Sequence, residues 1–178
     1  MNRRCIPVVL VLAILPIASS AAEWRNFSDP GRTFSFEVPE QVRVTRQAGT
    51  RPDGTALRTT LYGYGADKPG QLGCALAVTD YGEGITLPKN TPETMATIFK
   101  SQLQTLNVQP DIDTGIKLNN HSGRHLEFKD LKGDGIAFRW FVVRNRLFQL
   151  TCTTPPNAST AETAEVARVA SSLRFLPR

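Results

Sequence analysis

The chain has 178 residues, of which 40% are hydrophobic, and its 21 basic and 16 acidic side chains give a formal charge of +5. This length is sufficient for one domain with a sizeable core. The basic residues are scattered and are not interleaved with exposed aromatic residues, so nucleic acid is not expected as a partner.

The first 22 residues have the pattern of a secretory signal peptide. Arg3 and Arg4 give a positive start, residues 5–17 are largely apolar, and the small residues at 18–22 favour cleavage after Ala22. The apolar run of roughly 13 residues is shorter than the ~20 that a membrane helix needs, and no later segment is a better candidate. An uncleaved anchor is the alternative. We expect an exported protein, periplasmic or secreted, with a single mature domain over residues 23–178.

Removal of this leader changes the charge of the chain. The leader contains two of the 21 basic residues and none of the 16 acidic residues, so the mature chain carries +3. A charge of this size keeps a small domain soluble and identifies no particular partner.

Two of the three cysteines remain after the leader is removed. Cys5 leaves with the leader, whereas Cys74 and Cys152 each share the phase of the apolar residues in their predicted strands. Because an even pair of cysteines in an oxidising compartment usually forms a disulfide, we predict a bond between them. In the chain-entropy model, such a bond contributes about 4 kcal/mol to the free energy of unfolding. Two unpaired buried thiols are the alternative. Neither cysteine belongs to a C-x-x-C motif or has a histidine nearby in sequence, so a reactive or metal-binding role is not expected.

Alternating apolar and polar residues predict a series of strands. Their ranges are 33–38, 41–46, 55–62, 72–79, 113–118 and 123–129. Loops with glycine or proline separate several of them, notably at 62–71 and 81–90. The first of these loops contains Gly63-Tyr64-Gly65, but Lys68 stands where a phosphate-binding turn needs its third glycine and no helix pattern follows. The sequence therefore contains no motif for a cofactor or a metal.

Residues 135–153 are rich in aromatic and β-branched side chains and predict a β-hairpin. Asn145, which tolerates positive φ, is expected at its turn. The first strand of the hairpin is apolar on both faces apart from Arg139, which suits a central strand of a sheet. Trp140 is expected to anchor a core and to find a partner for its indole N–H.

Two amphipathic helices are predicted. Thr91 is expected to cap the first helix with Pro92 at its first position, and Ser159 with Glu162 forms a capping box for the second. The apolar stripes expected to face a core are Met95, Ile98, Phe99, Leu103 and Leu106 in the first helix, and Val166, Val169, Ala170 and Leu173 in the second. Small side chains at Ala161, Ala164 and Ala167 are expected to allow close approach to the sheet.

Strands outnumber helices and run mostly as hairpins. The predicted class is therefore α+β, with an antiparallel sheet of about six to seven strands covered by two amphipathic helices. The order of these pieces resembles the PsbP-like superfamily. The resemblance rests on Trp24 with residues 31–39 (GRTFSFEVP), the helix from Thr91, the hairpin at 139–151 and the closing helix into residues 172–175. It implies an adaptor or accessory protein without a shared active site, so it assigns no catalytic residue.

His121 and His125 are the only histidines, and they could belong to a small hydrolase or a metal-dependent enzyme. A spacing of four brings two ligands together on a helix, but Gly123 between them argues against a helix. Ser122 beside His121 lacks the surroundings of an activated nucleophile. Surface histidines without a catalytic role are the simpler interpretation.

Arg139, Arg144 and Arg146 lie near Trp140 in the sequence and form the candidate binding face. Arginines beside aromatic residues can bind an anionic group or a protein surface. The alternative is a solvated outer face of the sheet.

The hypothesis for function is an exported, non-enzymatic binding or accessory protein of the cell envelope. Its partner would be a protein or an envelope component, bound through a sheet face or through the loops at 63–71 and 81–90. One alternative is the small hydrolase or metal-dependent enzyme that uses His121 and His125. A second alternative is an immunity or inhibitor protein that binds one toxic enzyme tightly.

Overall fold

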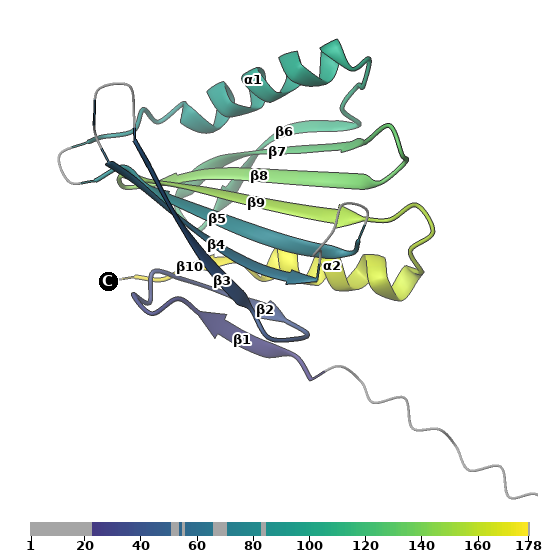
Figure 1. The fold of residues 1–178 in the computed structure, drawn as a ribbon, viewed down its shortest axis with the longest axis horizontal. Coiled ribbons are helices and arrows are strands. Elements are labelled where there is room, and N and C mark those ends of the chain that lie inside the picture. Colours follow the sequence, from purple (N-terminus) through teal and green to yellow (C-terminus); the bar gives the residue numbers. More distant parts are fainter. Residues whose placement is uncertain (1–22, 51–53, 55, 66–70, 83–84, 178) are drawn as a thin grey trace, which may run out of the picture.

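The computed structural model describes residues 23–177 apart from 51–53, 55, 66–70 and 83–84 (Figure 1). The strands are β1 (Arg25–Ser28), β2 (Phe34–Val38), β3 (Arg43–Thr50), β4 (Ala56–Gly65), β5 (Gly73–Asp80), β6 (Ile112–Leu118), β7 (His121–Lys129), β8 (Gly135–Val143), β9 (Arg146–Thr154) and β10 (Arg174–Phe175). The helices are α1 (Thr91–Thr105) and α2 (Thr160–Ser172). The predicted signal peptide and parts of the loops predicted at 63–71 and 81–90 lie outside the described residues. Within the described ranges, no helix has the length and apolar character needed to cross a membrane.

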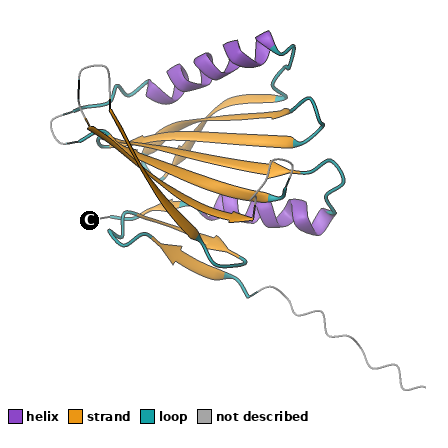
Figure 2. Ribbon diagram, viewed as in Figure 1, coloured by secondary structure: helices purple, strands orange, loops and turns teal. Residues whose placement is uncertain are grey.

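Seven strands form one antiparallel sheet in the order β3-β4-β5-β9-β8-β7-β6, and a smaller sheet has the order β1-β2-β10. The β5–β9 pairing joins the β3–β5 part of the large sheet to the β6–β9 part. Helix α1 packs on β7 and β8, whereas α2 packs on β2, β5 and β9 over the opposite face (Figure 2). The predicted α+β class, with two helices and a sheet of about seven strands, is confirmed.

The large sheet has a hydrophobic core on each face, because its central strands are apolar on both sides. Buried residues on the α2 face include Phe34, Phe36, Tyr62, Leu76, Phe148, Leu150, Val169 and Phe175. Buried residues on the α1 face include Ala96, Leu103, Leu126, Phe128, Phe138, Trp140 and Leu147. The small sheet and α2 thus cover one face together, and α1 covers part of the other.

The hairpin at 135–153 is confirmed as β8 and β9, but two details differ from expectation. The residue with positive φ at the turn is Arg144, at 61°, rather than Asn145. Asn145 instead donates from Nδ2 to the carbonyl of Gly82 at 2.6 Å, so its side chain joins the turn to the end of β5. Trp140 is 1% exposed and anchors the α1-side core, but its Nε1 has no acceptor among the described residues. Its ring stacks on Phe138 at 5.3 Å, in surroundings that are apolar.

Helix α1 begins at Thr91 as predicted, with Asn90 rather than Thr91 as its N-cap. The hydroxyl of Thr91 donates to the carbonyl of Pro88 and makes no cap. The predicted stripe is too wide, since Ile98 and Leu106 are 52% and 54% exposed. The helix lies over only β7 and β8, so only the narrow row that includes Ala96 and Leu103 is buried.

An ion-pair cluster fixes α1 to the edge of the sheet. Asp113 of β6 accepts hydrogen bonds from Lys100 of α1 at 2.5 Å and from Arg124 of β7 at 2.6 Å. Burial acts to raise the pKa of the Asp113 carboxyl, but the bonds from Lys100 and Arg124 outweigh it and hold the pKa below its usual value. The carboxylate is therefore stabilised in the form that keeps both contacts.

Helix α2 has the predicted capping box between Ser159 and Glu162. Its buried residues are Val166, Val169, Ala170 and the adjoining Leu173, as expected. The alanines Ala161, Ala164 and Ala167 are exposed, so they do not mediate the approach to the sheet. On the other side of the helix, Arg168 binds Glu37 of β2 at 2.7 Å and lies 3.9 Å from the ring centre of Trp24. These contacts hold α2 against the small sheet.

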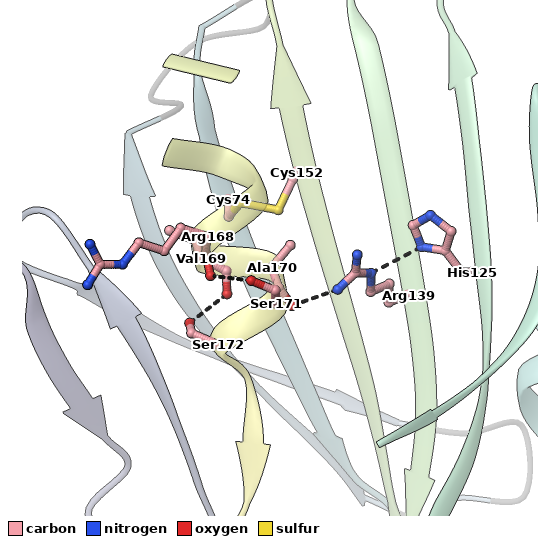
Figure 3. The surroundings of a disulfide bond; sticks show 9 residues. All are labelled: Cys74, His125, Arg139, Cys152, Arg168, Val169, Ala170, Ser171 and Ser172. Carbon is pink, nitrogen blue, oxygen red and sulfur yellow. Dashed lines mark hydrogen bonds between the residues drawn. A yellow bond between two sulfur atoms is a disulfide. The ribbon is translucent and has the colours of Figure 1, made fainter. Parts of the chain in front are cut away.

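The predicted disulfide is confirmed. Cys74 of β5 and Cys152 of β9 are direct cross-strand neighbours, with an S–S distance of 2.06 Å, and they lie beneath α2 (Figure 3). Their side chains are almost fully buried. The bond spans 78 positions of sequence, and the enclosed segment contains α1, β6, β7 and β8.

Replacement of both cysteines, as Cys74→Ala with Cys152→Ala, is expected to lower the free energy of unfolding by about 4 kcal/mol, because the unfolded chain regains the freedom of a long loop. Urea denaturation followed by circular dichroism measures the loss. A thiol reductant should weaken the wild-type chain and leave the double variant unchanged. Equal stability of the two proteins without reductant would contradict the prediction.

Gly123 of β7 is a close-packed position. A Cβ there would lie 2.4 Å from Cδ1 of Phe141 and 2.5 Å from the carbonyl oxygen of Trp140. Gly123→Ala should therefore lower the free energy of unfolding by about 2 kcal/mol through overpacking. Gly115→Ala in β6 is the matched control, because a Cβ at Gly115 meets no atom within 4 Å. Equal effects of the two substitutions in denaturant titrations would refute this account.

Candidate functional site

Antiparallel register brings polar residues together at the end of the large sheet where β8 turns into β9. Arg58 of β4 pairs with Asp80 of β5, which pairs in turn with Arg146 of β9. One row further along, Arg46 of β3 pairs with Thr60 of β4. Residues two apart on a strand point to the same face, so both rows project toward the α2 side of the sheet.

Two adjoining clefts open at this end of the sheet, and residues 175–177 near the C-terminus line one of them. We call the first the arginine cleft; it has a volume of about 300 Å³ and its lining includes Asp29, Phe34, Arg46, Arg58, Tyr62, Val78, Asp80 and Arg146. We call the second the turn-end cleft; it has a volume of about 370 Å³ and its lining includes Asn119, His121, Val143, Arg144, Phe148 and Phe175. Thr33 and Arg146 line both clefts, so one ligand can occupy the two together.

Asp80 holds Arg146 by one edge of its guanidinium. Nε of Arg146 donates to Oδ2 of Asp80 at 2.9 Å. The other carboxylate oxygen accepts from the backbone N–H of Gly82 at 2.9 Å and from Nδ2 of Asn145 at 3.4 Å. No hydrogen bond to a described residue uses the two Nη groups of Arg146. The guanidinium is thus fixed in place while its outer donors remain available.

Asp29 is the second acidic residue of the arginine cleft, and its oxygens are occupied by its own loop. One oxygen accepts from the backbone N–H groups of Thr33 and Phe34, and the other accepts from the N–H of Gly31 and the hydroxyl of Thr33. These bonds fix the tight turn between β1 and β2, in which Arg32 has a φ of 48°. Asp29 therefore builds the wall of the cleft and does not pair with an arginine in the described structure.

The aromatic ring of Tyr62 lines the same cleft, and the side chain ends in a phenol hydroxyl. Burial raises the pKa of Tyr62, and the Asp29 carboxylate adds to that effect against the opposing influence of Arg46 and Arg146. The phenol is therefore neutral throughout the physiological range. It provides a hydrogen-bonding group beside the arginines rather than a charge.

Arg139, one of the three arginines of the predicted binding face, lies elsewhere. It sits between the sheet and α2, where Nη1 donates to the carbonyl of Ala170 at 2.7 Å and Nε donates to Nδ1 of His125 at 3.1 Å (Figure 3). Burial lowers the pKa of Arg139, and Glu127 opposes that shift. Arg139 is thus a structural link between β7, β8 and α2, and the solvated outer face considered for it is wrong because α2 covers that side.

Arg144 and Arg146 do lie together at the turn, as neighbours in the turn-end cleft. Arg144 is exposed and makes no ion pair with a described residue, whereas Arg146 is held by Asp80. The structure therefore joins two of the three predicted arginines and separates the third. Sequence reasoning missed Arg46, Arg58 and Asp80, which come from other strands. Only the pairing register of β3, β4, β5 and β9 brings them to this place.

The two histidines occupy separate surroundings on one strand. His125 is 6% exposed; its Nδ1 accepts from Arg139, and its Nε2 is 2.7 Å from Oε1 of Glu127. This pattern requires the tautomer with the proton on Nε2. His121 packs edge-on against Phe175, with ring centres 5.3 Å apart, in the turn-end cleft. The two histidines are four positions apart along the strand, which corresponds to roughly 13 Å, so the rings do not form one site.

The described part of the chain contains no group of three or more His, Cys, Asp or Glu side chains placed to hold a metal. Ser122 lies on β7 between the histidines and is exposed. Successive strand residues point to opposite faces, so Ser122 and His121 project away from each other. Ser122 and His121 therefore do not form a nucleophile–base pair in this arrangement.

Comparison with known proteins identifies similarity of fold. No protein-family model matches the sequence, and no curated protein matches it. The fold is similar to the solution structure of cyanobacterial PsbP from Synechocystis sp. PCC 6803, with a TM-score of 0.57 and 13% sequence identity over 89% of this chain and 96% of that chain. A protein of unknown function from Pseudomonas aeruginosa, PA94, aligns with a TM-score of 0.44 and 10% identity over 87% of this chain and 97% of that chain.

The architecture defines an α+β domain in which a large antiparallel sheet carries a helix on each face and a polar, arginine-rich hollow at one end. Its fold is PsbP-like, as the order of elements in the sequence indicated.

The role of Arg139 as a structural link can be tested directly. Arg139→Ala removes the donor to Ala170 and to His125, and it should lower the free energy of unfolding by about 2 kcal/mol. Arg144→Ala, at an exposed position without a described partner, should change it by less than about 0.5 kcal/mol. Parallel denaturant titrations measure both values, and a larger loss for Arg144→Ala would show that the assignment is wrong.

Proposed function

We propose that this chain is an exported, non-enzymatic binding or accessory protein of the cell envelope. The observation that carries the proposal is the pair of adjoining clefts, where an apolar hollow meets several arginines. Of these, Arg46, Arg58 and Arg144 have no ion-pair partner among the described residues. Such a surface can donate hydrogen bonds to a partner and can bury apolar area against it. The PsbP-like fold is compatible with this role, since it is not tied to one chemistry.

Export is part of the proposal and has two supports. The first 22 residues have the charge and apolar pattern of a cleavable leader. The disulfide between Cys74 and Cys152 is of the kind that persists in an oxidising compartment such as the periplasm. We infer a periplasmic or secreted protein whose mature chain begins at Glu23.

A hydrolase or metal enzyme centred on His121 and His125 has no observation in its favour, because both ring nitrogens of His125 already have protein partners. An immunity or inhibitor protein is a special case of a binding protein. It differs in that its partner is a toxic enzyme, which loses activity in the complex.

The proposal predicts that the tagged chain, exported by its own leader and purified gently, retains one stoichiometric partner. Mass spectrometry of the purified complex identifies the partner and shows whether the chain lacks residues 1–22. His125→Ala, at a position outside both clefts, should retain the partner if the domain remains folded by circular dichroism. The proposal would be wrong if repeated preparations contained no partner. It would also be wrong if the chain kept its leader and stayed in the cytoplasm.

A further inference from the structure

We propose that the arginine cleft binds a carboxylate of the protein partner, with an adjacent apolar side chain of that partner in the turn-end cleft. The proposal rests on the proposed function, because it names the chemistry that the partner presents. It commits to an acidic peptide segment as the occupant.

Three guanidinium groups from different strands line the arginine cleft. Arg46, Arg58 and Arg146 belong to β3, β4 and β9, and their strands are fixed by continuous pairing through β5. Arg46 and Arg58 are exposed and have no hydrogen bond or ion pair with a described residue. The Nη groups of Arg146 are equally unused. Three like charges held this close favour a bound anion.

The acidic groups beside these arginines are already occupied by other donors. Asp29 and Asp80 are the carboxylates of the arginine cleft. Asp29 is occupied by N–H and O–H donors of its own loop, and Asp80 is occupied by Arg146, Gly82 and Asn145. Neither carboxylate forms a described bond with Arg46 or Arg58. The cleft therefore keeps an excess of positive charge and of free donors.

Apolar side chains line the same cleft as these charges. Phe34, Tyr62 and Val78 line the arginine cleft and belong to the core. These apolar walls reduce the local dielectric constant beside Arg146, which is half-buried, so an ionic hydrogen bond formed there is stronger than one in open water. The turn-end cleft adds Phe148 and Phe175, and it shares Arg146 with the arginine cleft. An acidic residue next to an apolar one fits this arrangement.

The shape and the residue type favour a peptide over a membrane surface. Both clefts are hollows of a few hundred cubic ångströms, about 300 and 370 Å³, rather than a flat basic face. All their cations are arginines, whose planar fork pairs with a carboxylate through two parallel hydrogen bonds. Binding to a lipid surface instead of an acidic peptide would overturn the proposal.

The test is a titration of the mature chain, followed by two-dimensional amide NMR, with two blocked dipeptides that differ in one group. The probes are N-acetyl-Glu-Phe-amide and N-acetyl-Gln-Phe-amide. The glutamate peptide should shift the amide signals of Thr33, Tyr62 and Arg146, and the glutamine peptide should bind roughly tenfold more weakly, which corresponds to about 1.4 kcal/mol. Raising the salt concentration should weaken binding of the glutamate peptide and leave binding of the glutamine peptide unchanged.

Variants locate the binding. The double variant Arg46→Gln/Arg58→Gln should bind the glutamate peptide roughly tenfold more weakly. The chain should remain folded, because both side chains are exposed and unpaired with any described residue. Arg25→Gln is the control, because Arg25 lies on β1 and pairs with Glu23, away from the clefts. Equal binding of both peptides, equal binding by the double variant, absence of shifts, or binding only to vesicles of anionic phospholipid would each overturn the proposal.

The same variants separate this inference from the proposed function. If the natural partner co-purifies equally well with wild type and with Arg46→Gln/Arg58→Gln, the proposed function stands and the assignment of the cleft is wrong. If the glutamate peptide binds as expected but no partner co-purifies, the cleft assignment stands and the proposed function is wrong.

Discussion

The pairing of β5 with β9 is the interaction on which the rest of the structure depends. These strands are separated by α1 and three strands in the sequence, yet they lie side by side at the centre of the large sheet. The Cys74–Cys152 bond links them covalently at one position of this register. Because antiparallel register fixes every row across a sheet, this pairing determines which residues of β4, β5, β8 and β9 become neighbours.

Strand register places both polar features of the α2 face. Toward the β8–β9 turn, the β5–β9 pairing aligns Asp80 with Arg146, and the β4–β5 pairing adds Arg58, so these residues lie at the rim of the core and line a cleft. Nearer the middle of the sheet, the β7–β8 pairing places Arg139 beside His125 under α2, where burial requires internal partners. Residues of the same type thus differ in role because one lies under a helix and the other lies at an open end.

The sequence allowed prediction of most of the fold, because strand alternation and capping are local signals. The hairpin of β8 and β9 and the capping box at Ser159 were predicted from such signals. The disulfide was predicted from the even pair of cysteines in a chain with a predicted leader. The candidate site was only partly predictable. Arg144 and Arg146 are adjacent in sequence, but Arg46 and Arg58 join them through strand pairing, which no local pattern encodes. The burial of Arg139 and the exposure of Ile98 depend on where each helix lies over the sheet, which is also a tertiary property.

The small sheet pairs strands from the two ends of the described chain. Strand β10 pairs with β2, and α2 covers both β2 and β5, so Phe34 and Phe36 gain their full cover from residues after position 160. A chain made from its N-terminus exposes this apolar surface until its last helix and strand have been synthesised. The α2-side core is therefore completed only at the end of synthesis. A nascent or truncated chain exposes apolar surface and is prone to aggregate.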